Sequence, residues 1–330
     1  MINEFDYDPA AADDFKRNYL ALVHGDAAPI HYPYTFIAPS NTGIPSGFDL
    51  DHDGATGGPG DAFGFGLFPG QFGMVVYSMF PIDYANVRTF QHFLWKDMPG
   101  ALLPNDPAAP EPAGWYAAEE LNVFRLSSKS HWDIPVTVGR ETIHFLVSHP
   151  TPPVYDDPVI NQNGRRNHDE IRFWADYITP SRDSYIYDDS GVSGGLKPGA
   201  LFVIAGDQNA DPLAGDSIPG AIQQLLDHPL VNDQLTPSSP GAVEQNALQG
   251  SANLAHRSSP AFDTAAFGDS AGNLRADYVL PCQNLTIEDA AVFWPLTSDP
   301  RFSLVDAASD HRLVWIDLTI PGKQTPTAPR

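Results

Sequence analysis

Two short apolar runs, each joined to a polar cluster, constrain this chain most. The run at 201–205 leads into a Gly-Asp-Gln-Asn tetrapeptide that carries Asp207 and Asn209, and the pair Asp310-His311 precedes the run at 313–316. An apolar run of four or five residues, partly β-branched, predicts a buried strand. Both polar clusters are therefore expected at strand ends, where a rigid sheet can hold several side chains around one reacting atom.

Further strands and helices are predicted from periodicity. Alternating apolar residues predict a hairpin, whereas apolar residues at i, i+3, i+4 and i+7 predict a helix. The predicted strands are 73–77, 134–138, 142–148, 277–280 and 313–318, and the predicted helices are 166–178, with Asn167 as N-cap and Glu170 in its capping box, and 219–226. Residues 229–274 are predicted to be mostly loop. This mixed order indicates an α/β or α+β fold with antiparallel strand pairs.

The composition limits the partners and the kinds of site. The formal net charge is −23, which repels DNA and anionic membranes at long range, so tight DNA binding is not expected. A divalent cation could still bring a phosphate ester to the chain, because it inverts the local potential. Cys282 is the only cysteine, which excludes an intrachain disulfide and a zinc site of the cysteine type. No apolar run is long enough for a membrane span.

The polar clusters suggest chemistry on a phosphate ester. Asp207 could orient or deprotonate a water molecule, and Asn209 could donate to a phosphate oxygen without adding negative charge. Each cluster alone could instead be a turn that closes a strand. His311 cannot easily pair with its neighbour in a strand, so Asp277 is the expected carboxylate that holds its ring. His149 follows the strand 142–148 and precedes a proline-rich loop, so it is a candidate general acid or phosphate donor.

Five segments together resemble the endonuclease/exonuclease/phosphatase superfamily, which has the deoxyribonuclease-I-like fold. They occur in the family's order, are specific together and weak apart, and cover nearly the whole chain: 2–5, 147–150, 206–209, 277–280 and 309–311. The resemblance implies one domain over residues 1–330 with a four-layer αββα sandwich, two packed mixed sheets flanked by helices. It also implies hydrolysis of phosphodiesters or phosphomonoesters with Mg²⁺ or Mn²⁺.

The resemblance assigns roles residue by residue. Glu4 matches the metal-binding glutamate, and Asp310 matches an aspartate near the metal. The catalytic positions that match the family are His149, Asp207, Asn209, Asp277 and His311. The family's first strand, with an asparagine that contacts the site, precedes the glutamate strand and has no counterpart here. A second chain that supplies this strand is one expectation; truncation or a rearranged fold are the others.

Three basic residues are candidates for substrate binding. Lys129 precedes the hairpin that leads to His149, where relatives often place a phosphate-contacting basic residue. Arg166 and His168 open the predicted helix, whose N-terminus could bind an anion. An exposed lysine and a solvated first turn are the alternatives.

The segment 49–54 matches the first half of a calcium loop, with Asp49, Asp51 and Asp53 as ligands. The glutamate expected at position 12 is absent, because that position is Gly60, with Asp61 beside it. A complete EF-hand is therefore excluded. A loop-stabilising Ca²⁺ remains an expectation, against a solvated acidic turn.

The sequence thus predicts a metal-dependent phosphoesterase that uses Mg²⁺ or Mn²⁺. The expected substrate is a small organic phosphate, a phospholipid head group or a short nucleotide. The alternatives are a secreted non-specific nuclease and a non-catalytic, calcium-stabilised binding module. The acidic composition and the relatives favour an extracellular or periplasmic location, although residues 1–4 show no signal peptide.

Overall fold

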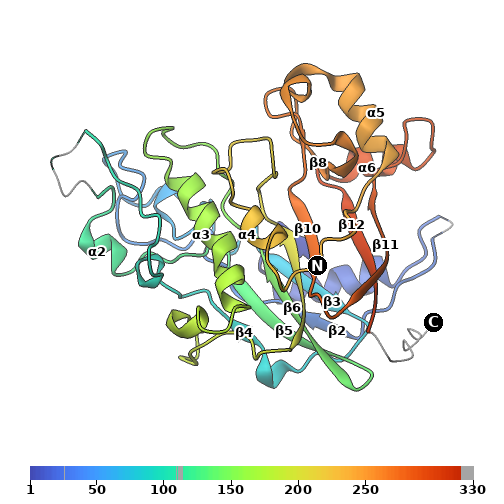
Figure 1. Cartoon of the computed structure of the whole chain (residues 1–330), viewed down its shortest axis with the longest axis horizontal. Helices are drawn as coiled ribbons and strands as arrows, with labels where there is room; N and C mark the ends of the chain where they lie inside the picture. The colour runs from blue at the N-terminus through green and yellow to red at the C-terminus, as the bar shows by residue number, and fades with distance from the viewer. Residues whose placement is uncertain (26, 109, 111–113, 321–330) are drawn as a thin grey trace.

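The centre of the protein is a five-stranded mixed sheet. The structure, a computed structural model, describes residues 1–320 except 26, 109 and 111–113 (Figure 1). The sheet order is β10-β7-β6-β5-β4, with β6 parallel to β7 and the other neighbours antiparallel. The strands are β4 (Arg88–Thr89), β5 (His131–Val138), β6 (Glu141–Ser148), β7 (Leu201–Asp207) and β10 (Asp277–Pro281). The predicted hairpin and the strand that ends at Asp207 are confirmed.

The other described strands form three smaller sheets. A three-stranded sheet has the order β1-β3-β2, and two further pairs are β11-β12 and β8-β9. Their bounds are β1 (Ile2–Asn3), β2 (Tyr34–Phe36), β3 (Met74–Ser78), β8 (Ala265–Ala266), β9 (Asn273–Leu274), β11 (Thr286–Phe293) and β12 (Leu313–Thr319). The described helices are α1 (Pro9–Phe15), α2 (Ala118–Leu121), α3 (Gln162–Tyr177), α4 (Gln223–Leu226), α5 (Pro240–Gln249) and α6 (Phe302–Ala308).

The two faces of the central sheet bury different partners because side chains alternate along a strand. Leu146 and Ile204 join the core beneath α3, whereas Val147 and Ala205, one residue further on, join a second core with Met74 of β3. On the outer side of the three-stranded sheet, the Tyr77 hydroxyl donates to the carbonyl of Ala12 in α1 at 2.8 Å. The order α3, large sheet, small sheet, α1 confirms the predicted αββα sandwich.

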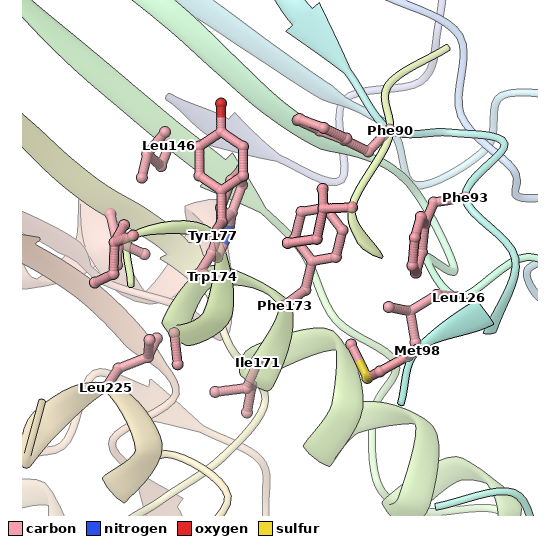
Figure 2. Close-up of a cluster of buried hydrophobic side chains, with 14 of the residues drawn as sticks. Phe90, Phe93, Met98, Leu126, Leu146, Ile171, Phe173, Trp174, Tyr177 and Leu225 are labelled. Carbon is pink, nitrogen blue, oxygen red and sulfur yellow. The ribbon is translucent and has the colours of Figure 1, made fainter. Parts of the chain in front are cut away.

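Helix α3 packs several large apolar side chains into the main core. Phe173 and Trp174 point from it into a cluster with Phe90, Phe93 and Leu146 (Figure 2). Phe90 and Phe93 make edge-to-face contacts with Phe173, with centroids 5.1 and 5.4 Å apart. Such pairs add to the free energy that burial of the rings provides. This packing fixes α3 firmly against the sheet that carries the polar clusters.

Several sequence predictions about helices are wrong. Helix α3 begins at Gln162, so Asn167 is inside the helix and is not its N-cap. Only residues 223–226 of the predicted helix 219–226 are helical. The predicted loop at 229–274 contains α5, which begins with a regular N-cap. The Ser239 hydroxyl accepts the N–H of Ala242 at 3.0 Å, and Pro240 occupies the first turn.

Among the described residues, no helix combines the length and the apolar character that crossing a bilayer requires.

Candidate functional site

The register of the central sheet brings three polar clusters to one edge. Strands β6 and β7 run parallel, so His149, which follows β6, and Asp207, at the end of β7, lie at the same side. Strand β10 runs the opposite way and begins at Asp277, which is the direct partner of Asp207 in the ladder. His311 precedes β12 and forms a bridge with Ala265. The sheet therefore gathers residues that are far apart in the sequence.

Asp207 is at the centre of this cluster. The Nε2 atom of His149 lies 3.3 Å from Oδ2 of Asp207, and Nε2 of His311 lies 3.8 Å from the same oxygen. The backbone N–H of Asn209 donates to Oδ1 at 2.7 Å. His311 in turn is held by Asp277, whose Oδ2 is 2.8 Å from Nδ1 of the ring. The predicted Asp277–His311 pair is therefore present in the geometry.

The charges in the cluster support an ionised Asp207. Burial acts to raise the pKa of this carboxyl, but the contact with His149, the charge of His311 and the N–H of Asn209 together bring it below its usual range. For His311, burial opposes the charge, yet the Asp277 and Asp207 carboxylates raise its pKa to about 10. At neutral pH the site thus holds an anionic Asp207 facing a cationic His311.

His149 has a different state. Its side chain is buried, and burial together with the nearby charge of Lys129 lowers its pKa to about 4. The Nδ1 atom has no hydrogen-bond partner among the described residues. A neutral ring with its proton on Nε2 satisfies the contact with Asp207, so His149 is a hydrogen-bond donor at neutral pH.

The backbone around Asp207 requires particular residues. Gly206 has φ of 141°, and a Cβ atom there would lie 2.0 Å from the carbonyl oxygen of Ser148. Only glycine allows this approach between β7 and the end of β6. Asn209 has φ of 50°, a left-handed conformation that asparagine tolerates better than most residues. Its side-chain N–H donates to the carbonyl of Pro150 at 3.1 Å, which ties the loop after β7 to the loop after His149.

A pocket of about 530 Å³ opens over this cluster. Glu4 and Asp310 are both exposed and line it, although they come from opposite ends of the chain. The site residues that line the pocket are Glu4, His149, Asp207, Asn209, Asp310 and His311. Glu4 has φ of 54°, and a left-handed conformation at a non-glycine residue is often found where function requires strain.

The exposed carboxylates of the pocket fit a divalent cation better than the buried cluster does. Asp207, Asp277 and His311 each place one nitrogen or oxygen atom within 4.8 Å of the others, but a cationic His311 has no lone pair for a metal. Glu4 and Asp310 add carboxylates at the rim of the same pocket. Carboxylate oxygens are the ligands that Mg²⁺ and Mn²⁺ prefer in proteins.

The three predicted substrate-binding residues lie outside this pocket. The Arg166 side chain is buried, and it donates to the carbonyls of Leu126, at 2.8 Å, and of Phe63. His168 lies beside Asp169, with Nδ1 3.1 Å from the carboxylate. Arg166 is four residues inside α3, which begins at Gln162, so it is not at the helix N-terminus, where an anion could bind, and neither Arg166 nor His168 lines the pocket.

Lys129 is buried behind the pocket. Its ammonium is 3.5 Å from the carbonyl of Pro150, and burial lowers its pKa, against the opposing charges of Glu170, Asp207 and Glu4. It does not line the pocket over the cluster. The interaction of Lys129 with the cluster is electrostatic, since its charge contributes to the lowered pKa of His149.

Two polar residues of α3 that the sequence suggests as helix caps instead brace the site. Glu170 is fully buried, and its two oxygens accept the N–H groups of Ser128 and Thr151, each at 2.6 Å. Asn167 donates to the carbonyls of Thr151 and Gln208, each at 2.9 Å. These contacts connect the segments that carry Lys129, His149 and Asp207. The sequence did contain a signal for the burial of these two residues, because both lie on the same helical face as the apolar stripe at 171, 174 and 178.

In the predicted calcium loop, the third clustered aspartate is Asp61 and not Asp53. Asp49, Asp51 and Asp61 each place one oxygen within 4.8 Å of the others, whereas Asp53 accepts the N–H of Ala55 at 2.8 Å. Asp61 is buried and already accepts the N–H of Leu50 at 2.7 Å. Partial desolvation, followed by repulsion from the neighbouring aspartates, raises the pKa of the exposed Asp51. The expected ligand Asp53 is therefore replaced by Asp61 in the geometry.

A further carboxyl, Asp263, is buried just before β8. Its Oδ1 atom has no hydrogen-bond partner among the described residues, and burial together with repulsion from Asp211 raises its pKa to about 8. The folded protein therefore holds a proton that the unfolded chain, with a carboxyl pKa of 3.8, releases. The unfolded state binds fewer protons between these values, so stability is expected to fall as pH rises from about 4 to about 8.

Asp263→Asn tests this linkage. An amide cannot ionise, so at pH 8 the variant is expected to gain up to about 5 kcal/mol in the free energy of unfolding, since the pKa of the wild-type carboxyl rises from 3.8 to about 8 on folding. At pH 4, where the carboxyl is protonated in the native protein, the two proteins should have similar stability. Denaturant unfolding at both pH values measures the difference. A gain of the same size at pH 4 would show that proton linkage is not its cause.

Comparisons with known proteins agree with this fold. A model of the Endonuclease/Exonuclease/phosphatase family matches residues 1–311, a stretch that contains every residue of the cluster. The chain belongs to the endonuclease/exonuclease/phosphatase family. No curated protein matches it in a sequence search.

Solved structures are similar at low identity. An endonuclease/exonuclease/phosphatase from Beutenbergia cavernae DSM 12333 is 18% identical, with a TM-score of 0.44, over 88% of this chain and 54% of that one. The chain thus spans about half the length of the Beutenbergia protein. Sphingomyelinase C from Streptomyces griseocarneus is 14% identical, with a TM-score of 0.38, over 94% of this chain and 79% of that one. Structural similarity at this level of sequence identity does not indicate which reaction the chain catalyses.

Proposed function

We propose that this protein is a metal-dependent phosphoesterase. The observation that carries the proposal is the position of Asp207, an anionic carboxylate between two histidines at the floor of an open pocket. The family match supports the same reaction class. A carboxylate of this kind can hold a water molecule and accept its proton as the water attacks phosphorus.

The other residues have complementary roles in this proposal. His149, neutral and with its proton on Nε2, keeps Asp207 oriented. His311, cationic and held by Asp277, faces the pocket and stabilises negative charge that develops on the phosphoryl oxygens. Asn209 uses one side-chain N–H for Pro150, and its second N–H is available to a phosphate oxygen. Glu4 and Asp310 would hold Mg²⁺ or Mn²⁺, which polarises the phosphoryl group and stabilises the leaving oxygen when bound.

The pocket favours a small substrate over nucleic acid. No arginine or lysine is among the described residues that line it, whereas Glu4, Asp211, Asp216 and Asp310 do. A polyanion would meet these carboxylates at each additional phosphate. We therefore propose a small phosphate ester, a phospholipid head group or a short nucleotide as substrate. The extracellular or periplasmic location stays a prediction that rests on the acidic composition.

Hydrolysis of chromogenic esters tests the proposal. p-Nitrophenyl phosphate and bis(p-nitrophenyl) phosphate are incubated with Mg²⁺, Mn²⁺, Ca²⁺ or EDTA. We expect turnover that EDTA abolishes, and we expect Glu4→Gln to need a higher metal concentration for half-maximal rate. Glu119→Gln, an exposed carboxylate on α2, is the matched control. A folded protein without turnover in any metal would favour the non-catalytic binding module, and salt-sensitive plasmid nicking would favour the nuclease.

A structural Ca²⁺ on the loop 49–61 is part of this proposal. Three crowded carboxylates repel one another, and a bound cation would relieve that repulsion. Ca²⁺ is expected to raise the melting temperature of the wild type and of Asp53→Asn, but not of Asp51→Asn. At 100 times the dissociation constant the gain is about 2.7 kcal/mol. Equal responses of the two variants in scanning calorimetry would contradict a site at Asp51.

We also propose that a strand from a second polypeptide can enter the groove between β1 and β12. The groove has a volume of about 700 Å³, and both strands line it. Strand β1 pairs only with β3 and β12 only with β11 among the described strands, so one edge of each is open. A strand inserted there could pair with both edges.

A synthetic peptide tests strand insertion. A peptide of alternating apolar and polar residues is added in trans, and the same peptide with proline at alternate positions is the control, because proline cannot donate to a ladder. The unsubstituted peptide should slow amide hydrogen exchange in β12 and raise the melting temperature. The same exchange rates with both peptides would rule out pairing at this edge.

A further inference from the structure

Thr264 connects three segments that build the site. Its side chain is buried, with 1% of the residue exposed. Its backbone N–H donates to the carbonyl of Leu274 at 2.9 Å, and its carbonyl accepts the N–H of Arg312 at 2.8 Å. The residue therefore lies between the segment that leads to Asp277 and the segment that carries His311. A group in this position can transmit the alignment of one segment to the other.

The hydrogen bonds of the Thr264 hydroxyl determine where its proton points. The oxygen accepts the N–H of Ala276 at 3.0 Å and the N–H of Asp277 at 2.9 Å. A hydroxyl has one proton and two lone pairs, so these two donors use its acceptor capacity. The third neighbour is Oδ2 of Asp277, at 2.8 Å. The hydroxyl must therefore donate to this carboxylate oxygen.

The same carboxylate oxygen also holds His311. Nδ1 of the ring is 2.8 Å from Oδ2 of Asp277, so two donors converge on one oxygen. With Nδ1 held in this way, Nε2 points toward Asp207 at 3.8 Å. The position of the Asp277 carboxylate, which Thr264 fixes, sets the direction of the imidazole. Hydrogen bonds of this kind behind a functional histidine commonly orient the ring.

We propose that Thr264 is a positioning residue for catalysis, which fixes the Asp277 carboxylate and through it the ring of His311. This inference rests on the proposed phosphoesterase function. Thr264 does not line the pocket, so it has no contact with substrate and acts only through Asp277. The hydroxyl is the essential group, because the methyl group takes no part in the hydrogen bonds.

Steady-state kinetics of three substitutions test the proposal. Thr264→Val keeps the shape and removes the hydroxyl, and it should lower kcat about 10- to 100-fold with little change in KM. Thr264→Ser keeps the hydroxyl and should retain most of the wild-type kcat. Thr264→Ala leaves room for a water molecule to accept the two N–H groups, so it provides the measurement if the valine variant does not fold. Thr286→Val, at an exposed threonine in β11, is the matched control.

A spectroscopic measurement separates this proposal from the proposed function. The Nδ1–H proton of His311 is observed by ¹H–¹⁵N NMR at fixed pH and assigned with His311→Gln. The signal should be the same in the wild type and Thr264→Ser, and shifted or broadened in Thr264→Val or Thr264→Ala. Wild-type kcat and an unchanged signal in the variants without the hydroxyl would overturn the proposal, as would failure of serine to restore either one. If the wild type has no turnover, the phosphoesterase proposal fails and the NMR signal still decides the role of Thr264.

Discussion

Asp207→Asn is expected to lower kcat by about 10²- to 10⁴-fold, the range for loss of a general base. The amide has nearly the same shape as the carboxylate, but it cannot accept a proton from water. It also removes the negative charge that both His149 and His311 face. Its oxygen can still accept the N–H of Asn209, so the loop should keep its conformation.

The measurement is the rate of ester hydrolysis at saturating substrate and metal, with circular dichroism to show that the variant is folded. Asp216→Asn is the matched control, because Asp216 is an exposed aspartate that lines the same pocket. We expect the control to retain nearly all of the wild-type kcat. If Asp207→Asn retained it too, Asp207 could not be the base.

Glu170→Ala is expected to destabilise the protein by about 3–5 kcal/mol, because it removes one partner of a buried set of charges. The wild-type carboxylate is fully buried and lies in the field of Lys129 and Arg166, both of which are also buried. The substitution removes the negative charge that most raises the pKa of both cations. It also leaves the N–H groups of Ser128 and Thr151 without an acceptor.

Denaturant unfolding measures this loss, and Glu119→Ala, an exposed glutamate on α2, should change stability by less than about 0.5 kcal/mol. Glu170→Gln keeps the size of the side chain and provides a second measurement if the alanine variant does not fold. Ser128 is next to Lys129, and Thr151 is two residues after His149. We therefore also expect lower activity in the folded variant. A free energy of unfolding equal to that of the wild type would show that the bracing contacts are unimportant.

The parts of the site that the sequence predicts are those that strand ends determine. Asp207 and Asp277 adjoin apolar runs with a clear strand pattern, and neighbouring strands bring such ends to one edge whatever the loops do. Their direct pairing across β7 and β10 follows from register, which the patterns alone do not give. The local turn at Asn209 depends on tertiary contacts with Pro150.

The wrong predictions have identifiable physical causes. Asn167 and Glu170 match a capping box, but the helix extends to Gln162, and tertiary burial turns both side chains inward. In the calcium loop, linear spacing favours Asp53 as a ligand. The chain instead folds back so that Asp61 accepts the N–H groups of Gly57 and Gly58 and lies beside Asp49. A motif defined by linear spacing cannot predict that the chain folds back in this way.

The wide separation of the site residues along the chain has a consequence for biosynthesis. Glu4 leaves the ribosome more than 300 residues before His311. Contacts between such distant segments form late, since the intervening chain must first be synthesised and closed into loops. A nascent chain can therefore bury its core around α3 before the pocket exists. Any hydrolytic activity that depends on His311 could therefore begin only once translation has passed this residue.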